Sequence, residues 1–226
     1  MEVLYEDNHI IIVNKAPGEI VQGDKTGDRP LCETLKDWIK EKYNKPGNVF
    51  LGVVHRLDRP VGGVTVFAKT SKALPRLNEM LRKGEIHKTY WAITRNRPPK
   101  EADTLMHYIS TVERNNKSFA HTAPKEGRKE ARLEYRLIAA SDRYFLVEVN
   151  LLTGRKHQIR VQMSAIGCPI RGDLKYGDKR SNPDGSISLI ARRIQFVHPV
   201  SGEKIDVTAP VPGKDVLWQA LAANID

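Results

Sequence analysis

Residues 131–137 read Ala-Arg-Leu-Glu-Tyr-Arg-Leu, so apolar and charged side chains alternate along this stretch. A period of two places the apolar side chains on one face of a β-strand and the charged ones on the other. A second strand-like run, residues 144–149, follows the turn-like Ser141-Asp142. The two runs are therefore expected to pair as an antiparallel hairpin.

Other periodic stretches lie on both sides of this hairpin. Further strands are expected over residues 3–5, 9–14, 64–69, 88–94, 187–191, 194–198 and 204–208. Helical spacing predicts helices over 31–43, over 154–166, and from an N-cap at Ser71 to Gly84, whereas the polar segment 95–129 is interpreted as exposed turns. Many adjacent strands with few helices between them indicate an α+β fold, with a mixed, mainly antiparallel sheet flanked by helices. One domain is expected over residues 1–226.

Length and composition exclude several classes of protein. A chain of 226 residues with 40% apolar residues and a mean hydropathy of −0.47 can bury a core and is too polar to live in a bilayer. The first residues lack the basic-then-apolar order of a signal peptide. Cys32 and Cys168 have no CxxC spacing, so neither a disulfide framework nor a thiolate zinc site is expected. We therefore expect a soluble, cytoplasmic protein.

The net charge of +10 is concentrated in two parts of the chain. Residues 51–100 contain 11 basic and 3 acidic side chains, and residues 151–226 contain 11 and 7. Clustered cations favour a polyanionic partner such as RNA, although a solvated basic face would have the same composition.

The segment His55-Arg56-Leu57-Asp58-Arg59 places one carboxylate among basic side chains, shortly before Gly62-Gly63. Neighbouring cations would keep Asp58 ionised as a nucleophile or base, while the alternative is a turn whose charges neutralise one another. A third metal ligand at suitable spacing is missing, and the other histidines are scattered along the chain. No metal is therefore expected.

A second basic segment runs from Thr153 to Arg160. On a helix, Lys156, His157 and Arg160 would share one face near the N-terminus, which would suit phosphates or a buried carboxylate, or simply form a solvated helix end. Tyr90 and Trp91 lie on opposite faces of a predicted strand, so one would be core and the other free to stack on a base. The tripeptide 171–173 is interpreted as a turn. No nucleotide-binding glycine fingerprint and no Gly-x-Ser-x-Gly elbow is present, so no cofactor is expected.

Three ordered motifs together resemble those of the RluA-type pseudouridine synthases: 55–58 with Gly63, 88–92, and 152–160. Supporting matches are Glu6-Asp7, Asn14-Lys15 and Gly172-Asp173-x-x-Tyr176-Gly177. The order and spacing agree over roughly residues 4 to 210. Departures at 60–63 and at Cys168-Pro169 affect no residue with an assigned catalytic role. The resemblance implies the pseudouridine synthase fold and a catalytic domain without a separate N-terminal RNA-binding domain.

The same resemblance implies an isomerase that converts uridine in rRNA or tRNA to pseudouridine without cofactor or metal. Asp58 would be the essential carboxylate, as nucleophile or as base, with Arg160 as its ion-pair partner. Tyr90 would stack on the target base after base flipping, and Arg56 would fill the gap that the flipped uridine leaves. The remaining residues expected to contact RNA or to wall the uracil pocket are His55, Arg59, Arg155, His157 and Ile159. A monomer is expected.

Two other functions remain open at this point. A catalytically silent RNA-binding or RNA-folding protein on the same scaffold would have the same basic composition. A carboxylate-based glycosidase would also attack a glycosidic carbon, but it normally needs two carboxylates, and the motifs around Asp58 contain no second one.

Overall fold

The computed structural model describes residues 1–223 and 225. They group into two compact units. Unit 1 comprises Met1–Ile86 and Arg193–Ala209, and unit 2 comprises His87–Arg192 and Pro210–Asp226. The expectation of one catalytic domain over residues 1–226 stays a prediction. In the part of the chain that the structure describes, no helix is long and apolar enough to cross a membrane.

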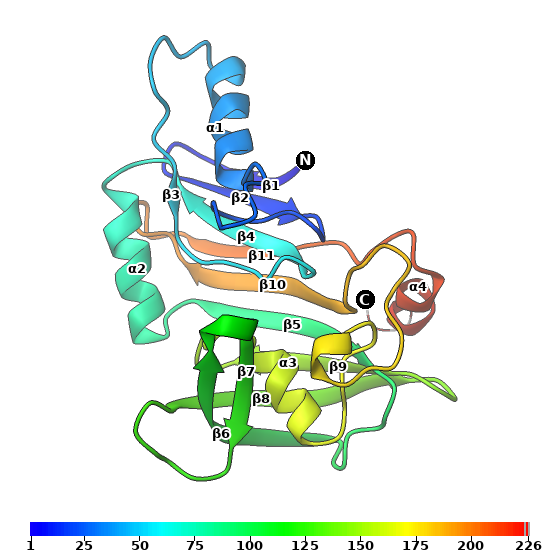
Figure 1. Cartoon of the computed structure of the whole chain (residues 1–226). Coiled ribbons are helices and arrows are strands. Elements are labelled where there is room, and N and C mark those ends of the chain that lie inside the picture. Colours follow the sequence, from blue (N-terminus) through cyan, green and yellow to red (C-terminus); the bar gives the residue numbers. More distant parts are fainter. Residues whose placement is uncertain (224, 226) are drawn as a thin grey trace. The chain divides into compact units, whose positions relative to one another are not determined.

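Unit 1 is built on antiparallel strands with two helices (Figure 1). Its strands are β1 (Glu2–Glu6), β2 (Ile10–Lys15), β3 (Gly52–Val53), β4 (Gly62–Ala68), β11 (Lys204–Thr208) and the second half of β10 (Leu189–Val197). Its helices are α1 (Leu31–Lys42) and α2 (Ala73–Lys83). Strand β2 pairs with β1 and β4, β3 pairs with β4, and β11 pairs with β10, all antiparallel.

The central strand β2 of unit 1 is covered on both faces. Ile11 and Val13 pack with Leu35 of α1, while Ile10 and Ile12 pack in the cluster that contains α2 residue Leu77. A strand buried on both faces carries a continuous apolar run instead of an alternating one. This explains the unbroken apolar sequence of β2.

Unit 2 contains a five-stranded antiparallel ladder in the order β5-β9-β8-β6-β7. The strands are β5 (His87–Thr94), β6 (Ala102–Val112), β7 (Lys117–His121), β8 (Lys129–Ala140) and β9 (Phe145–Leu151). A 3-10 turn η1 (Glu113–Asn115) joins β6 to β7, and a second, η2 (Leu174–Tyr176), follows the helix α3 (Gln158–Ala165). Helix α4 (Val216–Ala222) lies near the end of the chain.

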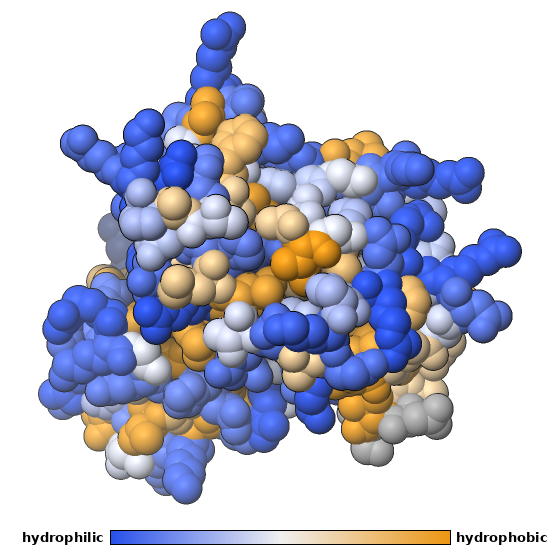
Figure 2. Space-filling model, turned by 90° about the horizontal axis from the view of Figure 1, so that it is seen from below, coloured by the Kyte–Doolittle hydropathy of each residue, from blue (hydrophilic) through white to orange (hydrophobic). Residues whose placement is uncertain are grey.

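Two helices of unit 2 pack on its strands. Val161 of α3 packs in a cluster with Ile109 of β6 and Ala131 of β8, and Trp218 of α4 packs with Trp91 of β5 and Leu146 of β9. Figure 2 shows one face of the molecule, on which hydrophilic side chains predominate and hydrophobic groups lie between them.

The predicted fold class is confirmed, including the hairpin formed by β8 and β9. Several details were wrong. Segment 95–129 is not only turns, because it forms β6, β7 and their connection, and α4 was not anticipated. Residues 187–191 and 194–198 were expected as two strands, whereas β10 runs without interruption over Leu189–Val197. Ser71 is not the N-cap of α2: the N-cap is Lys72, which makes no side-chain capping bond, and the Thr70 hydroxyl accepts from the Ala73 N–H at 3.2 Å.

Candidate functional site

Asp58 lies in unit 1, in the loop that connects β3 to β4. The buried ammonium group of Lys15, at the end of β2, holds this loop in place by hydrogen bonds to its backbone. Its Nζ donates to the carbonyl oxygens of Val61 at 2.7 Å, Arg59 at 3.2 Å and Asp58 at 3.4 Å. The Asp58 carbonyl also accepts from the Val61 N–H at 3.0 Å, which closes a tight turn directly after Asp58. The backbone around the carboxylate is therefore fixed by one side chain and one turn.

Lys15 is only 1% exposed, and a lysine in such a place is uncommon without compensation. Burial lowers its pKa to about 8, although the carboxylates of Glu19 and Asp58 act in the opposite direction. Backbone carbonyls supply most of its hydrogen bonds, including that of Ala16 at 3.1 Å. Lys15 thus fixes the position of the loop through its bonds to backbone carbonyls and does not form a surface ion pair.

The glycine pair that follows the loop has a steric reason. A Cβ on Gly62 would lie 3.0 Å from the Lys15 carbonyl oxygen and 3.1 Å from the Pro17 ring. Gly63 has φ = 111°, in the region that disfavours side chains. At Gly62 the backbone thus packs closely against residues 15–17 of the chain itself.

The three basic residues beside Asp58 differ in their contacts and exposure. The Nε2 atom of His55 accepts a hydrogen bond from the Val66 N–H at 3.1 Å, so this imidazole rests on β4. Arg56 is exposed. Arg59 binds Asp28 at 2.6 Å and the Thr26 hydroxyl at 2.8 Å. Their assignment to RNA binding stays a prediction.

Tyr90 and Trp91 lie on opposite faces of β5 in unit 2, as expected for successive residues of a strand. Both residues are buried, so the expected division into one core ring and one free ring was wrong. Trp91 is 5% exposed and belongs to the cluster with Trp218, and Arg192 lies 4.5 Å from its ring centroid. Tyr90 is 6% exposed, and its stacking on a base stays a prediction. Lys88, two residues earlier on the Tyr90 side of the strand, is mostly buried, and this burial lowers its pKa.

The basic segment 153–157 is a turn and not the first part of a helix. Helix α3 begins at Gln158, because His157 adopts the left-handed conformation with φ = 55°. The Gln158 side chain holds the turn by accepting from the Arg155 N–H at 2.9 Å and from the Thr153 hydroxyl at 2.8 Å. The prediction that Lys156, His157 and Arg160 share a helix face was therefore wrong.

These basic side chains also differ in exposure. Lys156 reaches Glu113 at 3.0 Å on the surface, and Arg155 is exposed and donates to the Glu130 carbonyl at 2.8 Å. Ile159 is buried. His157 is buried too, with Nδ1 at 2.7 Å from the Tyr176 hydroxyl.

Arg160 of α3 is 5% exposed and forms a two-bond ion pair with Asp173. The Nε atom donates to Oδ2 at 2.7 Å and Nη2 donates to Oδ1 at 2.9 Å. The guanidinium carbon also lies 5.0 Å from the centroid of the Tyr176 ring. Two of the five N–H groups of the guanidinium are used by Asp173, and its plane is fixed by this pair.

Asp173 and Tyr176 were not assigned a role from the sequence. The motif Gly172-Asp173-x-x-Tyr176-Gly177 was the available signal. The turn predicted at 171–173 is present, since the Asp173 N–H donates to the Ile170 carbonyl at 3.0 Å. Burial raises the pKa of Tyr176, whose hydroxyl accepts from the Ser118 N–H at 2.8 Å. The turn thus places the Asp173 carboxylate and the Tyr176 ring next to Arg160.

The predicted site residues fall into two groups. The loop after β3 in unit 1 carries His55, Arg56, Asp58 and Arg59, and unit 2 carries Tyr90, Arg155, His157, Ile159 and Arg160. The ion pair between Asp58 and Arg160 stays a prediction.

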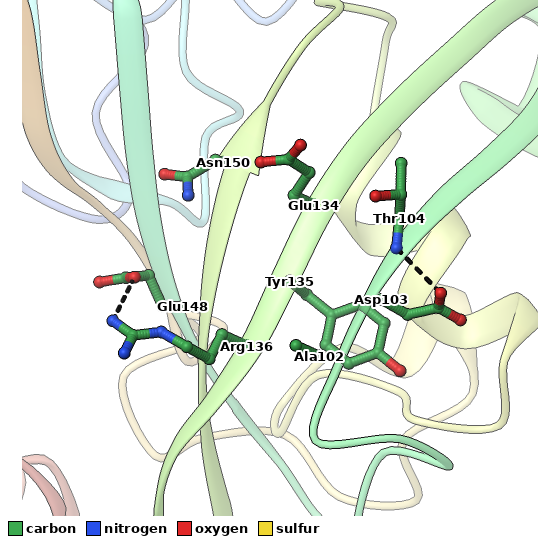
Figure 3. Close-up of a pocket in the computed structure, with 8 residues that line it drawn as sticks. All are labelled: Ala102, Asp103, Thr104, Glu134, Tyr135, Arg136, Glu148 and Asn150. Carbon is green, nitrogen blue, oxygen red and sulfur yellow. Dashed lines mark hydrogen bonds and ion pairs between the residues drawn. The ribbon is translucent and has the colours of Figure 1, made fainter.

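An open hollow of about 430 Å³ lies on the strands of unit 2 (Figure 3). It is lined by Ala102, Asp103, Thr104, Glu134, Tyr135, Arg136, Glu148 and Asn150. Arg136 donates to Glu148 at 2.9 Å across it. None of the predicted site residues lines this hollow, and its carboxylates disfavour a polyanion, so we do not assign it to the site.

Comparison with known proteins adds an independent finding. A model of the RNA pseudouridylate synthase family matches residues 9–165, a segment that contains Asp58, Tyr90 and Arg160. The tRNA pseudouridine synthase C of Vibrio parahaemolyticus is 31% identical over 247 residues, covering 100% of this chain and 95% of the relative. The ribosomal large subunit pseudouridine synthase D of Xanthomonas campestris is 32% identical over 226 residues, covering 94% and 66%.

A solved structure supports the fold. The human RNA Pseudouridylate Synthase Domain Containing 4 superimposes with a TM-score of 0.81 at 24% identity, covering 97% of this chain and 92% of that one. Some curated relatives are longer proteins: the chain spans 62 to 66% of the lengths of three of them.

Proposed function

Because the chain belongs to the RNA pseudouridylate synthase family, we propose that it isomerises uridine in RNA to pseudouridine, with Asp58 as the essential carboxylate. The observation that carries this proposal is the family match over residues 9–165, which includes Asp58 within the motif 55–58. The fixed loop around Asp58 supports it. A carboxylate that attacks one atom of a bound nucleotide must be held in place, and Lys15 holds the backbone at Asp58 and directly after it.

In the proposed reaction the glycosidic carbon–nitrogen bond of the uridine breaks, the uracil turns, and one of its ring carbons bonds to the same ribose. That carbon then loses its proton, and the ring nitrogen that left the ribose gains one. Asp58 acts on the ribose as nucleophile, or removes a proton as the base of an elimination. Arg160 would favour the charged carboxylate if it lies within about 4–6 Å of it. Its two bonds to Asp173 fix the plane of the guanidinium in unit 2. Tyr90 would stack on the target base.

The proposed substrates are tRNA and large-subunit rRNA, the RNAs named in the descriptions of the relatives. The net charge of +10 supports a polyanionic substrate. We further propose that the chain acts as a monomer in the cytoplasm and that Arg56 occupies the space that the flipped uridine leaves.

The test is product analysis. Purified protein is incubated with transcripts of tRNA and large-subunit rRNA labelled in uridine, and the digested nucleosides are separated. Pseudouridine is expected from the unaltered protein. Asp58→Asn should give none while its affinity for the same RNA, measured by filter binding, stays within about twofold.

Other products would contradict the proposal in distinguishable ways. RNA binding without any product would indicate the silent RNA-binding protein, and free uracil would indicate a glycosidase. Pseudouridine from Asp58→Asn would remove Asp58 from its assigned role.

A further inference from the structure

The strands β7, β6 and β8 of unit 2 present a sheet face that is separate from the residues assigned to the reaction. Strand pairing places Val112 opposite Lys117, Ser110 opposite Phe119, and Tyr108 opposite His121. Side chains that are opposite in an antiparallel pair point to the same face. We call the surface made by Met106, Tyr108, Val112, Phe119 and His121 the open face.

The open face exposes large apolar side chains. Met106 is 50% exposed, Val112 44% and Phe119 39%. The opposite face of the same strands is covered, because Ile109 of β6 and Ala131 of β8 pack in a cluster with Val161 of α3. Helix α3, which carries Arg160, therefore lies on the other side of this sheet.

Cations surround the aromatic side chains of the open face. Lys117 Nζ lies 5.7 Å from the centroid of the Phe119 ring. Burial lowers the pKa of His121, and the nearby positive charges of Arg128 and Lys125 lower it further. The one carboxylate in the His121–Tyr108 row, that of Glu130, is paired with Arg132 at 2.9 Å. The surroundings therefore favour an anionic ligand.

The extent of the open face limits what it can hold. From Val112 to Met106 the strand is roughly 20 Å long, at about 3.4 Å per residue. Beyond Met106 the same face continues with Thr104 and Glu134, which line the carboxylate-rich hollow of Figure 3. A polyanion would be repelled there, so the favourable part is restricted to the length of two or three nucleotides.

We propose that the open face binds single-stranded RNA, with Phe119 and Tyr108 stacking on bases and Lys117, Lys125 and Arg128 contacting phosphates. The exposed ring of Phe119 and the half-buried ring of Tyr108 lie on adjacent antiparallel strands next to cations. Together they offer the two contacts that unpaired RNA needs. A protein partner with a purely apolar surface would gain nothing from the cations. The proposal rests on the proposed function only in taking RNA as the partner, and it would give the substrate a contact with unit 2 in addition to that with Asp58.

The experiment measures fluorescence anisotropy of a labelled 12-nucleotide oligouridylate with the full chain. Phe119→Ala and Phe119→Leu should each weaken binding about fivefold or more, since one lost stacking contact is worth at least about 1 kcal/mol. Phe119→Tyr should restore it, because a flat ring is retained. The matched control is Phe50→Ala, which removes an equally exposed phenylalanine, 46% exposed, from unit 1.

A charge variant provides a second readout that does not depend on Phe119. Lys117→Glu should weaken binding and reduce the dependence of log affinity on log salt, whereas Lys40→Glu on the exposed side of α1 should do neither. The proposal would be overturned if Phe119→Ala bound the oligouridylate as tightly as Phe50→Ala does. It would also be overturned if Phe119→Leu bound as tightly as the unaltered chain, because leucine keeps the apolar contact but cannot stack.

Other outcomes also decide between partners and functions. If Phe119→Ala changes the sedimentation of the protein but not its RNA affinity, the open face joins two copies of this chain and the proposal is wrong. Binding needs no isomerisation, so Phe119-dependent affinity without pseudouridine would support the open face and reject the proposed function. Pseudouridine formation with Phe119-independent binding would do the reverse.

Discussion

Arg160 and Asp173 are joined by two hydrogen bonds in the interior of unit 2, with side chains 6% and 1% exposed. The pair connects α3 to the turn that precedes η2, and it sets the plane of the guanidinium. A residue assigned to catalysis therefore also contributes to the folding of its unit.

Asp173→Asn should lower the free energy of unfolding by about 3 kcal/mol or more, because it leaves the Arg160 charge buried without its carboxylate. Urea unfolding followed by circular dichroism measures this change. Asp206→Asn is the matched control, since Asp206 also forms two hydrogen bonds with an arginine, Arg193, but both side chains are more than 40% exposed. That variant should lose less than about 1 kcal/mol. Similar losses in the two variants would show that burial of the Arg160 pair is irrelevant to stability.

Replacing both partners separates folding from activity. In the double variant Arg160→Met, Asp173→Leu neither charge of this pair remains, so its free energy of unfolding should exceed that of Asp173→Asn. Pseudouridine formation should nevertheless be abolished, because Arg160 is absent. Activity of a stable double variant above that of Asp173→Asn would contradict the role proposed for Arg160.

Lys15 links the stability of unit 1 to pH. Its pKa is about 8 in the folded chain and 10.5 ordinarily, so between pH 8 and 10.5 the unfolded chain binds more protons. Stability then rises with pH over this window and falls as pH decreases towards 8. The difference in free energy of unfolding between the unaltered chain and Lys15→Met should grow by up to about 3 kcal/mol from pH 8 to 10.5. Chemical unfolding at four pH values measures it.

Other groups titrate in the same pH window, but they are present in both proteins. Taking the difference in free energy of unfolding between the unaltered chain and Lys15→Met therefore cancels their contributions. Lys40→Met, on the exposed side of α1, controls for the loss of any lysine. A flat difference for Lys15→Met would mean that Lys15 keeps an ordinary pKa. At pH 7 Lys15→Met should also be less stable by about 2 kcal/mol, because buried carbonyls around Asp58 lose their donor.

The strands that have a clear period were predictable from the sequence. Alternation in 131–137 located β8, and the unbroken run Ile10–Val13 located β2. Strands β6 and β7 were missed because their covered face is partly polar: Ser118 is fully buried and donates to the Lys156 carbonyl, and His107 bonds to Gln162. A strand whose inward residues are polar has no hydrophobic period.

The candidate site was predictable as a set of residues and less so as an arrangement. Asp58 stood out as the one carboxylate among cations, and its role was assigned through the resemblance carried by the three ordered motifs. The boundary of α3 was not, because the backbone of His157 turns left-handed where its side chain meets the Tyr176 hydroxyl, a contact between residues 19 apart in sequence. The roles of Lys15 and Asp173 likewise depend on partners that are distant along the chain.

Strand β10 belongs to unit 2 at its start and to unit 1 at its end. Ile194 and Phe196, with β11, complete the core cluster that Ile10 and Val66 begin. During synthesis on the ribosome, residues 1–86 would therefore emerge without the strands that cover them, while all of unit 2 up to residue 192 is still being made. Unit 1 closes late, so its exposed apolar strands are the part of the nascent chain most in need of a chaperone.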